Sequence, residues 1–224
     1  HGVTTTTTTT SSSSSSSPSS CAAAASAEER TRVVACHLGT GGSSAAAICG
    51  GQTVDTSMGW GTVPGLVMST RCGDVDPGIV IDMVAKGMAP GEVSTVLSKE
   101  SGLVGLTDGL TSDLRDVFRV ATEQPQHEKN ALCRLAFDVY AHRLVGVIGS
   151  LVAVMGGVDV LAFTDDLGFN MWQLREAVCQ RLAWLGVSID KEANAKTAKN
   201  EGLLENSDVA LIQSPDSKVV VAVV

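Results

Sequence analysis

Short apolar runs of strand length alternate along the chain with longer segments in which apolar residues recur every three or four positions. We expect the short runs to be β-strands and the longer segments to be helices. The expected strands are 32–36, 45–49, 52–56, 158–163, 187–189, 209–213 and 218–224. The expected helices are 77–86, 91–100, 114–122, 127–155 and 171–184. Strands that alternate with helices, after an opening antiparallel hairpin at Gly50-Gly51, predict an α/β layered domain.

The apolar run at 144–163 approaches the ~20 residues that a membrane span needs. Gly156-Gly157 interrupts this run, and Asp159 places a charge within it. We therefore expect a buried helix that ends at the two glycines and a buried strand after them. No membrane partner is predicted.

Residues 4–20, TTTTTTTSSSSSSSPSS, contain no apolar side chain and have no periodicity. Such a segment buries too little apolar surface to offset its ordering entropy. We expect residues 1–29 to be a disordered Thr/Ser-rich segment or a loop insertion, followed by a folded region at 30–224. The chain begins at His1 rather than at a methionine, so we expect the true N-terminus to be missing.

Composition narrows the classes of partner. Of the 224 residues, 24 are acidic and 16 are Lys or Arg, which gives a net charge of −8. An acidic protein without a basic face is not expected to bind nucleic acid. The six cysteines show neither a CxxC pair nor the Cys/His spacing of zinc fingers. We expect an intracellular protein in a reducing compartment, in the cytoplasm or in an organelle.

The stretch at 35–44, ACHLGTGGSS, places a histidine and three glycines after an apolar strand. Glycines allow backbone N–H groups to turn toward an anion, and Ser and Thr hydroxyls add donors. A tight hairpin turn would use the same residues. The P-loop pattern is excluded because no GK[ST] follows. From the spacing alone, the stretch is either a turn or a phosphate-binding loop.

The following segment, DTSMGWGTVPGLVMSTRCGDVDP at 55–77, decides between these readings. Together with HLGTGGSS it resembles the two signatures of the acetate kinase family, HLGNG-x-S and DTSMG-x-TPLEGL-x-M-x-TR-x-GD-x-DP. The resemblance continues through 98–117 and 157–190. It implies a ribonuclease H-like (actin-like ATPase) lobe with a mixed sheet flanked by helices, the C-terminal lobe of a kinase whose N-terminal lobe is missing. It also implies phosphoryl transfer between ATP and acetate with Mg²⁺, and a homodimer.

The resemblance assigns roles to individual residues. Arg71 matches an arginine that stabilises the transferring phosphoryl group, a role that suits a planar, always charged guanidinium. His1-Gly2 would be the remnant of an HGTSH motif whose first histidine is catalytic. From the residues alone, Asp113 would be a helix cap. The residues implied to bind the nucleotide or its phosphates are His37, Leu38, Gly39, Thr40, Gly41, Asp113, Leu114, Arg115, Gly168 and Asn170.

The sequence departs from the family pattern at three segments. Thr40 stands where the family has asparagine. The adenosine loop GGIGEN appears as DDLGFN, so that Asp165 and Asp166 add negative charge near a polyphosphate. The TNEE segment, with a glutamate near Mg²⁺, is aligned with Pro215-Asp216-Ser217-Lys218, which has no glutamate, and no metal ligand is assigned.

Three functional hypotheses follow. The first is an acetate kinase-like phosphotransferase that is incomplete and divergent in this chain. The second is a propionate or butyrate kinase, which the sequence does not separate from the first. The third is a non-catalytic relic of the fold that retains only nucleotide binding or dimerisation.

Overall fold

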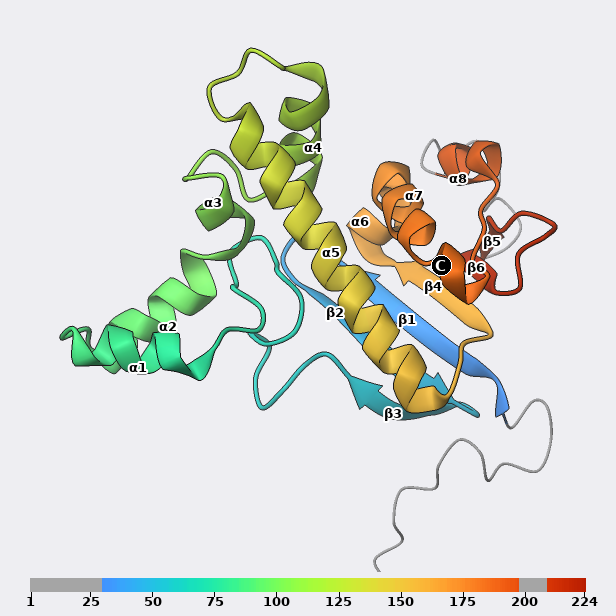
Figure 1. The fold of residues 1–224 in the computed structure, drawn as a ribbon, viewed down its shortest axis with the longest axis horizontal. Helices are drawn as coiled ribbons and strands as arrows, with labels where there is room; N and C mark the ends of the chain where they lie inside the picture. The colour runs from blue at the N-terminus through green and yellow to red at the C-terminus, as the bar shows by residue number, and fades with distance from the viewer. Residues whose placement is uncertain (1–29, 198–208) are drawn as a thin grey trace, which may run out of the picture.

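The computed structural model describes residues 30–197 and 209–224 (Figure 1). Its strands are β1 (Arg32–Leu38), β2 (Ser43–Cys49), β3 (Gln52–Thr56), β4 (Val160–Thr164), β5 (Ala210–Leu211) and β6 (Val220–Val223). Its helices are α1 (Pro77–Ala85), α2 (Pro90–Lys99), α3 (Gly102–Leu106), α4 (Leu114–Glu123), α5 (Asn130–Met155), α6 (Asp165–Asn170), α7 (Trp172–Arg181) and α8 (Lys191–Thr197), with a 3₁₀ turn at Ala183–Leu185. The expected Thr/Ser segment and His1 lie outside the described residues.

The strands form one mixed sheet in the order β3-β2-β1-β4-β6-β5. β1 pairs with β2 in antiparallel and with β4 in parallel orientation, and β6 continues the parallel part beside β4. Gly50 and Gly51 have φ angles of 57° and 76°, the positive values that a two-residue hairpin turn between β2 and β3 requires. The predicted mixed sheet and opening hairpin are confirmed.

The parallel strands bring distant residues to one edge of the sheet. His37 near the end of β1 pairs in register with Thr164, the last residue of β4. The carboxyl ends of β1, β4 and β6 therefore lie at the same edge, and the segments that follow β1 and β4 meet there. In open α/β sheets this is the edge at which ligands bind.

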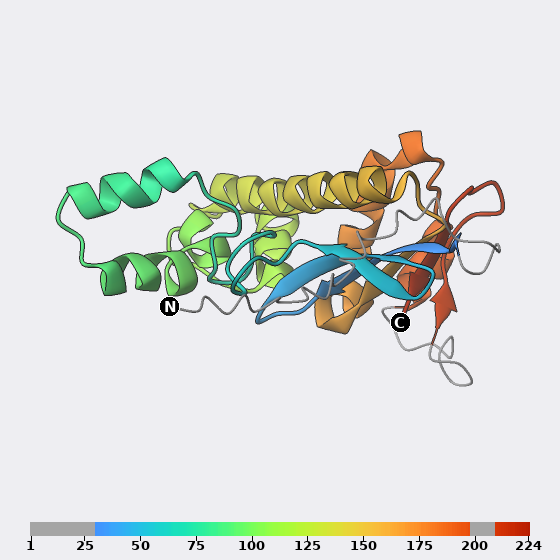
Figure 2. The ribbon, with the colours of Figure 1, turned by 90° about the horizontal axis from the view of Figure 1, so that it is seen from below.

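The helix α5 covers one face of the sheet (Figure 2). Alternate residues of β1 on that face, Val34, Cys36 and Leu38, are 0% exposed. By length and composition α5 could cross a membrane, but it packs along β1, β2 and β3 and beside α4 and α7. It ends at Gly156, whose φ of 70° is left-handed, and β4 follows. The expectation of a buried helix followed by a strand is confirmed.

Several predicted boundaries are wrong. The strand expected at 187–189 is a single bridge from Ile189 to Gln213, and that expected at 209–213 shrinks to β5. The helix expected at 171–184 divides into α7 and the 3₁₀ turn before Gly186. The short helices α3, α6 and α8 were not expected. Segments of five to seven residues are too short to display a clear helical period.

The described cysteines are of two kinds. Cys36, Cys133 and Cys179 are buried free thiols, and Cys72 is a half-buried free thiol. Cys49 is disulfide-bonded, which does not fit the expected reducing compartment.

Raising the pH above about 8 is expected to destabilise the fold. Burial raises the pKa of the Cys36 thiol, and it raises the pKa values of Cys179 and Tyr140 to about 12 each. In the unfolded chain these groups ionise near their ordinary values, about 8.5 for Cys and about 10 for Tyr. The unfolded state then binds fewer protons than the folded state, so the free energy of unfolding falls as the pH rises. The stabilisation is complete below about pH 8 and is lost progressively toward pH 12.

Urea denaturation at pH 7, 9 and 10 measures this loss. Each buried thiol contributes a slope of up to about 1.4 kcal/mol per pH unit above its unfolded pKa. The variant Cys179→Ala removes one of these groups and should have a shallower decline between pH 9 and 10. An unchanged slope in that variant would contradict the prediction.

Candidate functional site

The loop at 39–42 joins β1 to β2 and begins directly after the buried Leu38. The Gly39 N–H donates to the Gly42 carbonyl at 3.0 Å, so the loop is a tight turn. A Cβ on Gly39 would collide with the Asp165 carboxylate and the Gly42 carbonyl, which leaves room only for glycine. The buried Leu38 side chain belongs to the core, and only its backbone is available to a ligand. The hairpin reading of the stretch is therefore confirmed, and the phosphate-binding reading stays a prediction for this glycine-rich turn at the carboxyl ends of the parallel strands.

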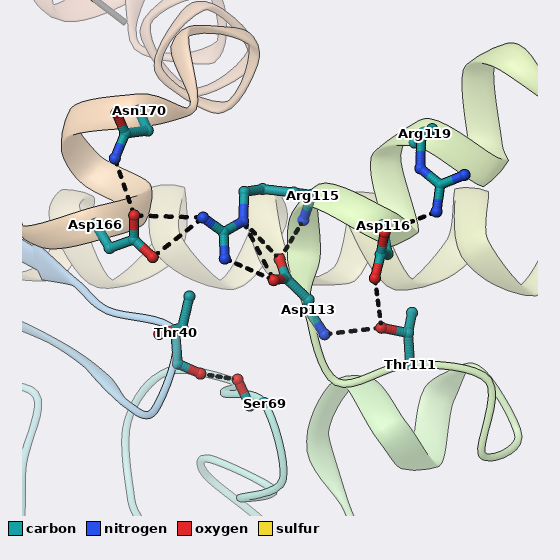
Figure 3. Close-up of polar contacts among 9 residues, drawn as sticks. All are labelled: Thr40, Ser69, Thr111, Asp113, Arg115, Asp116, Arg119, Asp166 and Asn170. Carbon is teal, nitrogen blue, oxygen red and sulfur yellow. Dashed lines mark hydrogen bonds and ion pairs between the residues drawn. The ribbon is translucent and has the colours of Figure 1, made fainter.

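Two side-chain hydroxyls, those of Ser43 and Ser69, form hydrogen bonds that hold this loop in place. At the start of β2, the buried Ser43 hydroxyl lies 2.8 Å from the Tyr140 hydroxyl of α5. From the segment between β3 and α1, the Ser69 hydroxyl donates to the Thr40 carbonyl (Figure 3). Ser69 is not among the predicted site residues, because nothing in its spacing relates it to Thr40.

The segment between β3 and α1 is irregular, and its glycines shape it. Gly65 and Gly73 have φ angles of 96° and 74°, which disfavour any other residue. A Cβ on Gly73 would lie 2.8 Å from the Leu66 carbonyl carbon, so the backbone at 73 packs directly against the backbone at 66. The Gly65 N–H donates to the Asp74 carboxylate at 2.8 Å and closes the segment. The glycines and the aspartate of this motif therefore fold the loop that carries Arg71.

Arg71 places its guanidinium beside the 39–42 loop. Nη1 donates to the Thr62 carbonyl at 3.0 Å, and Nη2 lies 3.4 Å from the Gly41 carbonyl. A Cβ on Gly42 would lie 2.9 Å from Nη1, so the absence of a side chain there admits the arginine. Within residues 30–197 and 209–224, no carboxylate forms an ion pair with Arg71. Its positive charge is therefore available to an anion at the loop.

Asp113 and Arg115 mark the start of α4. The Asp113 carboxylate accepts from the Arg115 N–H at 2.9 Å and so caps the helix, as the residues alone predict. The Arg115 guanidinium returns to the same carboxylate at 2.7 Å and lowers the pKa of Asp113 by this hydrogen bond. Between them, Leu114 is fully buried, so its side chain contributes to the core rather than to a ligand.

Residues 165–170 form the short helix α6 directly after β4, where the sequence predicted a loop. Asp165 has a φ of 67°, a left-handed conformation that is uncommon outside glycine. Its carboxylate Oδ2 lies 3.1 Å from Nε2 of His37. A Cβ on Gly168 would lie 3.3 Å from the Phe163 carbonyl carbon, so the glycine lets α6 pack closely against the end of β4.

Asp166 joins α6 to α4. Its carboxylate accepts from the Asn170 amide at 2.9 Å and lies 3.2 Å from Nη1 of Arg115 (Figure 3). The Arg115 guanidinium therefore lies between Asp113 and Asp166. The structure thus brings together residues of α4 and α6 that were predicted to contact the nucleotide. One of the joining side chains, Asp166, departs from the family pattern.

The described site residues thus gather at one edge of the sheet. His37, the 39–42 loop and Arg71 form one half, in which the Arg71 guanidinium has no carboxylate partner among the described residues. The α4 and α6 residues form the other half, which is rich in carboxylates. This arrangement can bind an anion at the glycine loop, while Asp165 and Asp166 place negative charge directly beside it.

The predicted alignment of a metal segment at 215–218 is wrong. These residues precede β6, and β6 runs parallel to β4 with Val220 opposite Val160. They therefore lie at the amino ends of the parallel strands, whereas His37 lies near the carboxyl end of β1. Asp216 instead accepts from the Ser214 hydroxyl at 2.6 Å. Among the described residues, no group of three or more His, Cys, Asp or Glu side chains could hold a metal ion.

The cavity between β3, the 57–74 segment and α5 is separate from this site. Its volume is about 350 Å³, and Asp55, His142, Arg143 and Ser150 are among its lining residues. None of the predicted site residues lines it.

Comparisons with known proteins give a consistent picture. A model of the Acetokinase family matches residues 17–224. Acetate kinase of Thermosipho africanus is 42% identical over 197 residues, which make up 87% of this chain and 45% of that protein. Acetate kinase of Coprothermobacter proteolyticus is 43% identical over 191 residues, which make up 85% of this chain and 44% of that protein. The chain thus spans about half the length of the curated relatives it matches.

Solved structures agree with these relatives. The crystal structure of acetate kinase from Entamoeba histolytica has a TM-score of 0.80 at 41% identity, over 88% of this chain and 49% of that chain. The structure of a propionate kinase from Francisella tularensis has a TM-score of 0.74 at 31% identity, over 88% of this chain and 46% of that chain. These values support the α/β lobe that the sequence predicts.

Proposed function

Because the chain belongs to the acetokinase family, we propose that it forms the nucleotide-binding half of a kinase that transfers a phosphoryl group between ATP and acetate. The observation that carries this proposal is the Arg71 guanidinium, which lies beside the glycine loop without a carboxylate partner in the described chain. A guanidinium beside a glycine-rich turn is suited to the charge of a transferring phosphoryl group.

The residues of this chain have separate tasks in the proposed reaction. The backbone of the 39–42 loop and the His37 side chain contact the phosphates. Arg71 stabilises the charge on the transferring group, with bidentate donors at fixed spacing. Arg115 contacts the adenosine part from the start of α4. Magnesium, when bound, neutralises charge on the phosphates and takes most of its ligands from phosphate and water, and no residue of this chain is assigned to it.

A non-catalytic relic is the second candidate, and a specific contact favours it. Asp165 places its carboxylate 3.1 Å from His37, at the position from which the loop would reach a phosphate. An anion that arrives at the loop must compete with this carboxylate. A propionate or butyrate kinase remains an alternative within the first candidate, supported by the similarity to the Francisella tularensis propionate kinase.

We also propose that the chain acts as a homodimer. Support comes from α1, which has an apolar composition but no buried residue. Ile79, Ile81 and Val84 are 51%, 68% and 47% exposed. The α1–α2 pair projects away from the sheet (Figure 2). Contact with a second copy would remove this apolar surface from water.

Calorimetric titration of Mg-ATP into the chain tests the proposed function. We expect binding that weakens in the variant Arg115→Ala, because this change removes the guanidinium at the start of α4. Arg119→Ala is the matched control, since Arg119 is an exposed arginine of the same helix that pairs with Asp116. A chain that is folded by circular dichroism and gives no heat at millimolar Mg-ATP would favour the relic.

A further inference from the structure

Arg175 of α7 is a buried cation that the proposed function leaves unexplained. Its side chain is 0% exposed, and its four hydrogen bonds all go to neutral oxygen atoms. Nη1 donates to the carbonyls of Gly168 and Phe169 at 2.7 and 2.6 Å. Nε donates to Oδ1 of Asn194 at 2.7 Å, and Nη2 donates to the Asn194 carbonyl at 2.8 Å. No carboxylate pairs with it in the described part of the chain.

A buried guanidinium without a counterion is costly, because the charge loses its hydration. Burial accordingly lowers the pKa of Arg175 to about 10. An apolar side chain would pack α7 without this cost. We therefore look for the role of Arg175 in the groups that it binds. Two of these are backbone carbonyls at the C-terminal end of α6. The last carbonyls of a helix lack intrahelical partners, and a cation suits them.

These contacts extend from the interior to the site surface. Asn194 of α8 fixes the guanidinium from the far side, and its own amide donates to the Trp172 carbonyl at 3.0 Å. The fork of Arg175 thereby ties α6, α7 and α8 together. On the outer side of α6, Asn170 donates to Asp166, which lies beside Arg115. The orientation of α6 therefore decides where both side chains lie.

We propose that Arg175 is a positioning residue for the nucleoside part of the site, which it serves by holding the C-terminal end of α6 in place. This inference rests on the proposed function, because it takes α6 as the segment that passes the nucleoside. The planar guanidinium is required because its donors reach acceptors on α6 and α8 at the same time. A lysine keeps the charge but has no such fork. The 39–42 loop has no hydrogen bond to Arg175 and meets α6 at Asp165, the first residue of that helix, whereas Arg175 binds its last turn, so we expect the phosphate half of the site to depend less on Arg175.

The variant Arg175→Lys in the full chain tests this inference by titration with ATP, adenosine and pyrophosphate. We expect ATP and adenosine to bind about ten- to hundredfold more weakly, as for lost hydrogen bonds to a charged group, with unchanged affinity for pyrophosphate. Asn130→Ala is the control, because Asn130 is another buried residue whose amide donates to backbone carbonyls, here those of Val120 and Ala121 in α4. Equal losses for all three ligands, or unchanged ATP affinity, would overturn the inference.

Hydrogen exchange separates this inference from the proposed function. If the wild-type chain binds no nucleotide, the proposed function fails, but amide exchange still reports how firmly α6 is held. Arg175→Lys should speed exchange at the Met171 N–H, which donates to the Leu167 carbonyl, by about tenfold or more. Exchange at the Gly39 N–H should not change. Should Arg175→Lys fail to fold, Asn194→Ala is the second variant. It removes the side-chain oxygen that accepts from Nε of Arg175, and it should also speed exchange at the Met171 N–H. Unchanged exchange at Met171 in the folded variant would refute the positioning role.

Discussion

Replacement of Arg71 by alanine is expected to lower turnover about a thousandfold or more, as for other arginines that stabilise a transferring phosphoryl group. The change should act on kcat more than on KM, because the charge is needed most when the phosphoryl group is in transit. The fold should survive, since the Arg71 guanidinium donates to exposed backbone carbonyls rather than to a buried network. The measurement is formation of acetyl phosphate from ATP and acetate.

The chain spans about half of its relatives, so this assay uses a hybrid protein. In the hybrid, the first half of the Thermosipho africanus acetate kinase precedes residues 30–224. Arg143→Ala is the matched control, because Arg143 is a partly exposed arginine that pairs with Asp74 of the same segment and lies in the separate cavity. Gly42→Ala is a second variant that keeps the arginine but places a Cβ 2.9 Å from Nη1. Unchanged turnover of Arg71→Ala would rule out the assigned role.

Replacement of both Asp165 and Asp166 by glycine is expected to raise the affinity for Mg-ATP about tenfold or more. Asp165 lies beside His37 and the 39–42 loop, and Asp166 lies beside Arg115. A carboxylate and a phosphate a few ångströms apart repel by about 1 kcal/mol even in water. The change also frees His37 and Arg115 from their contacts with α6. At position 165 it restores glycine where φ is 67°, which removes backbone strain of about 1 kcal/mol.

Titration of the single and double variants distinguishes charge from shape. Asp165→Asn keeps the side chain and tolerates the left-handed conformation, so it isolates the effect of the charge. Asp116→Asn on the surface of α4 is the control for a general change of net charge. Unchanged ATP affinity in the double variant would mean that the carboxylates lie away from the polyphosphate. A lower affinity would mean that Asp166 is needed to hold Arg115.

The sequence by itself determined the features that depend on neighbouring residues. Gly50-Gly51 between two apolar runs predicted the hairpin, because a two-residue turn needs positive φ at both positions. The apolar period along 127–155 and the glycines after Met155 predicted α5 and the strand that follows it. The glycines of the 55–77 motif likewise carry their own backbone requirements. Such features are local, and the residues alone are sufficient to specify them.

Only the tertiary structure decided the features that join distant segments. The parallel pairing of β1 with β4 sets Asp165 against His37, and no spacing in the sequence predicts that contact. The parallel pairing of β4 with β6 argues against 215–218 as a metal segment, because it places these residues at the opposite edge of the sheet. Arg175 reads as an ordinary polar residue of an amphipathic helix, yet its four hydrogen bonds are buried between α6 and α8. The physical reason is that hydrogen bonds and charges act over a few ångströms of space, and the fold alone sets which residues come that close.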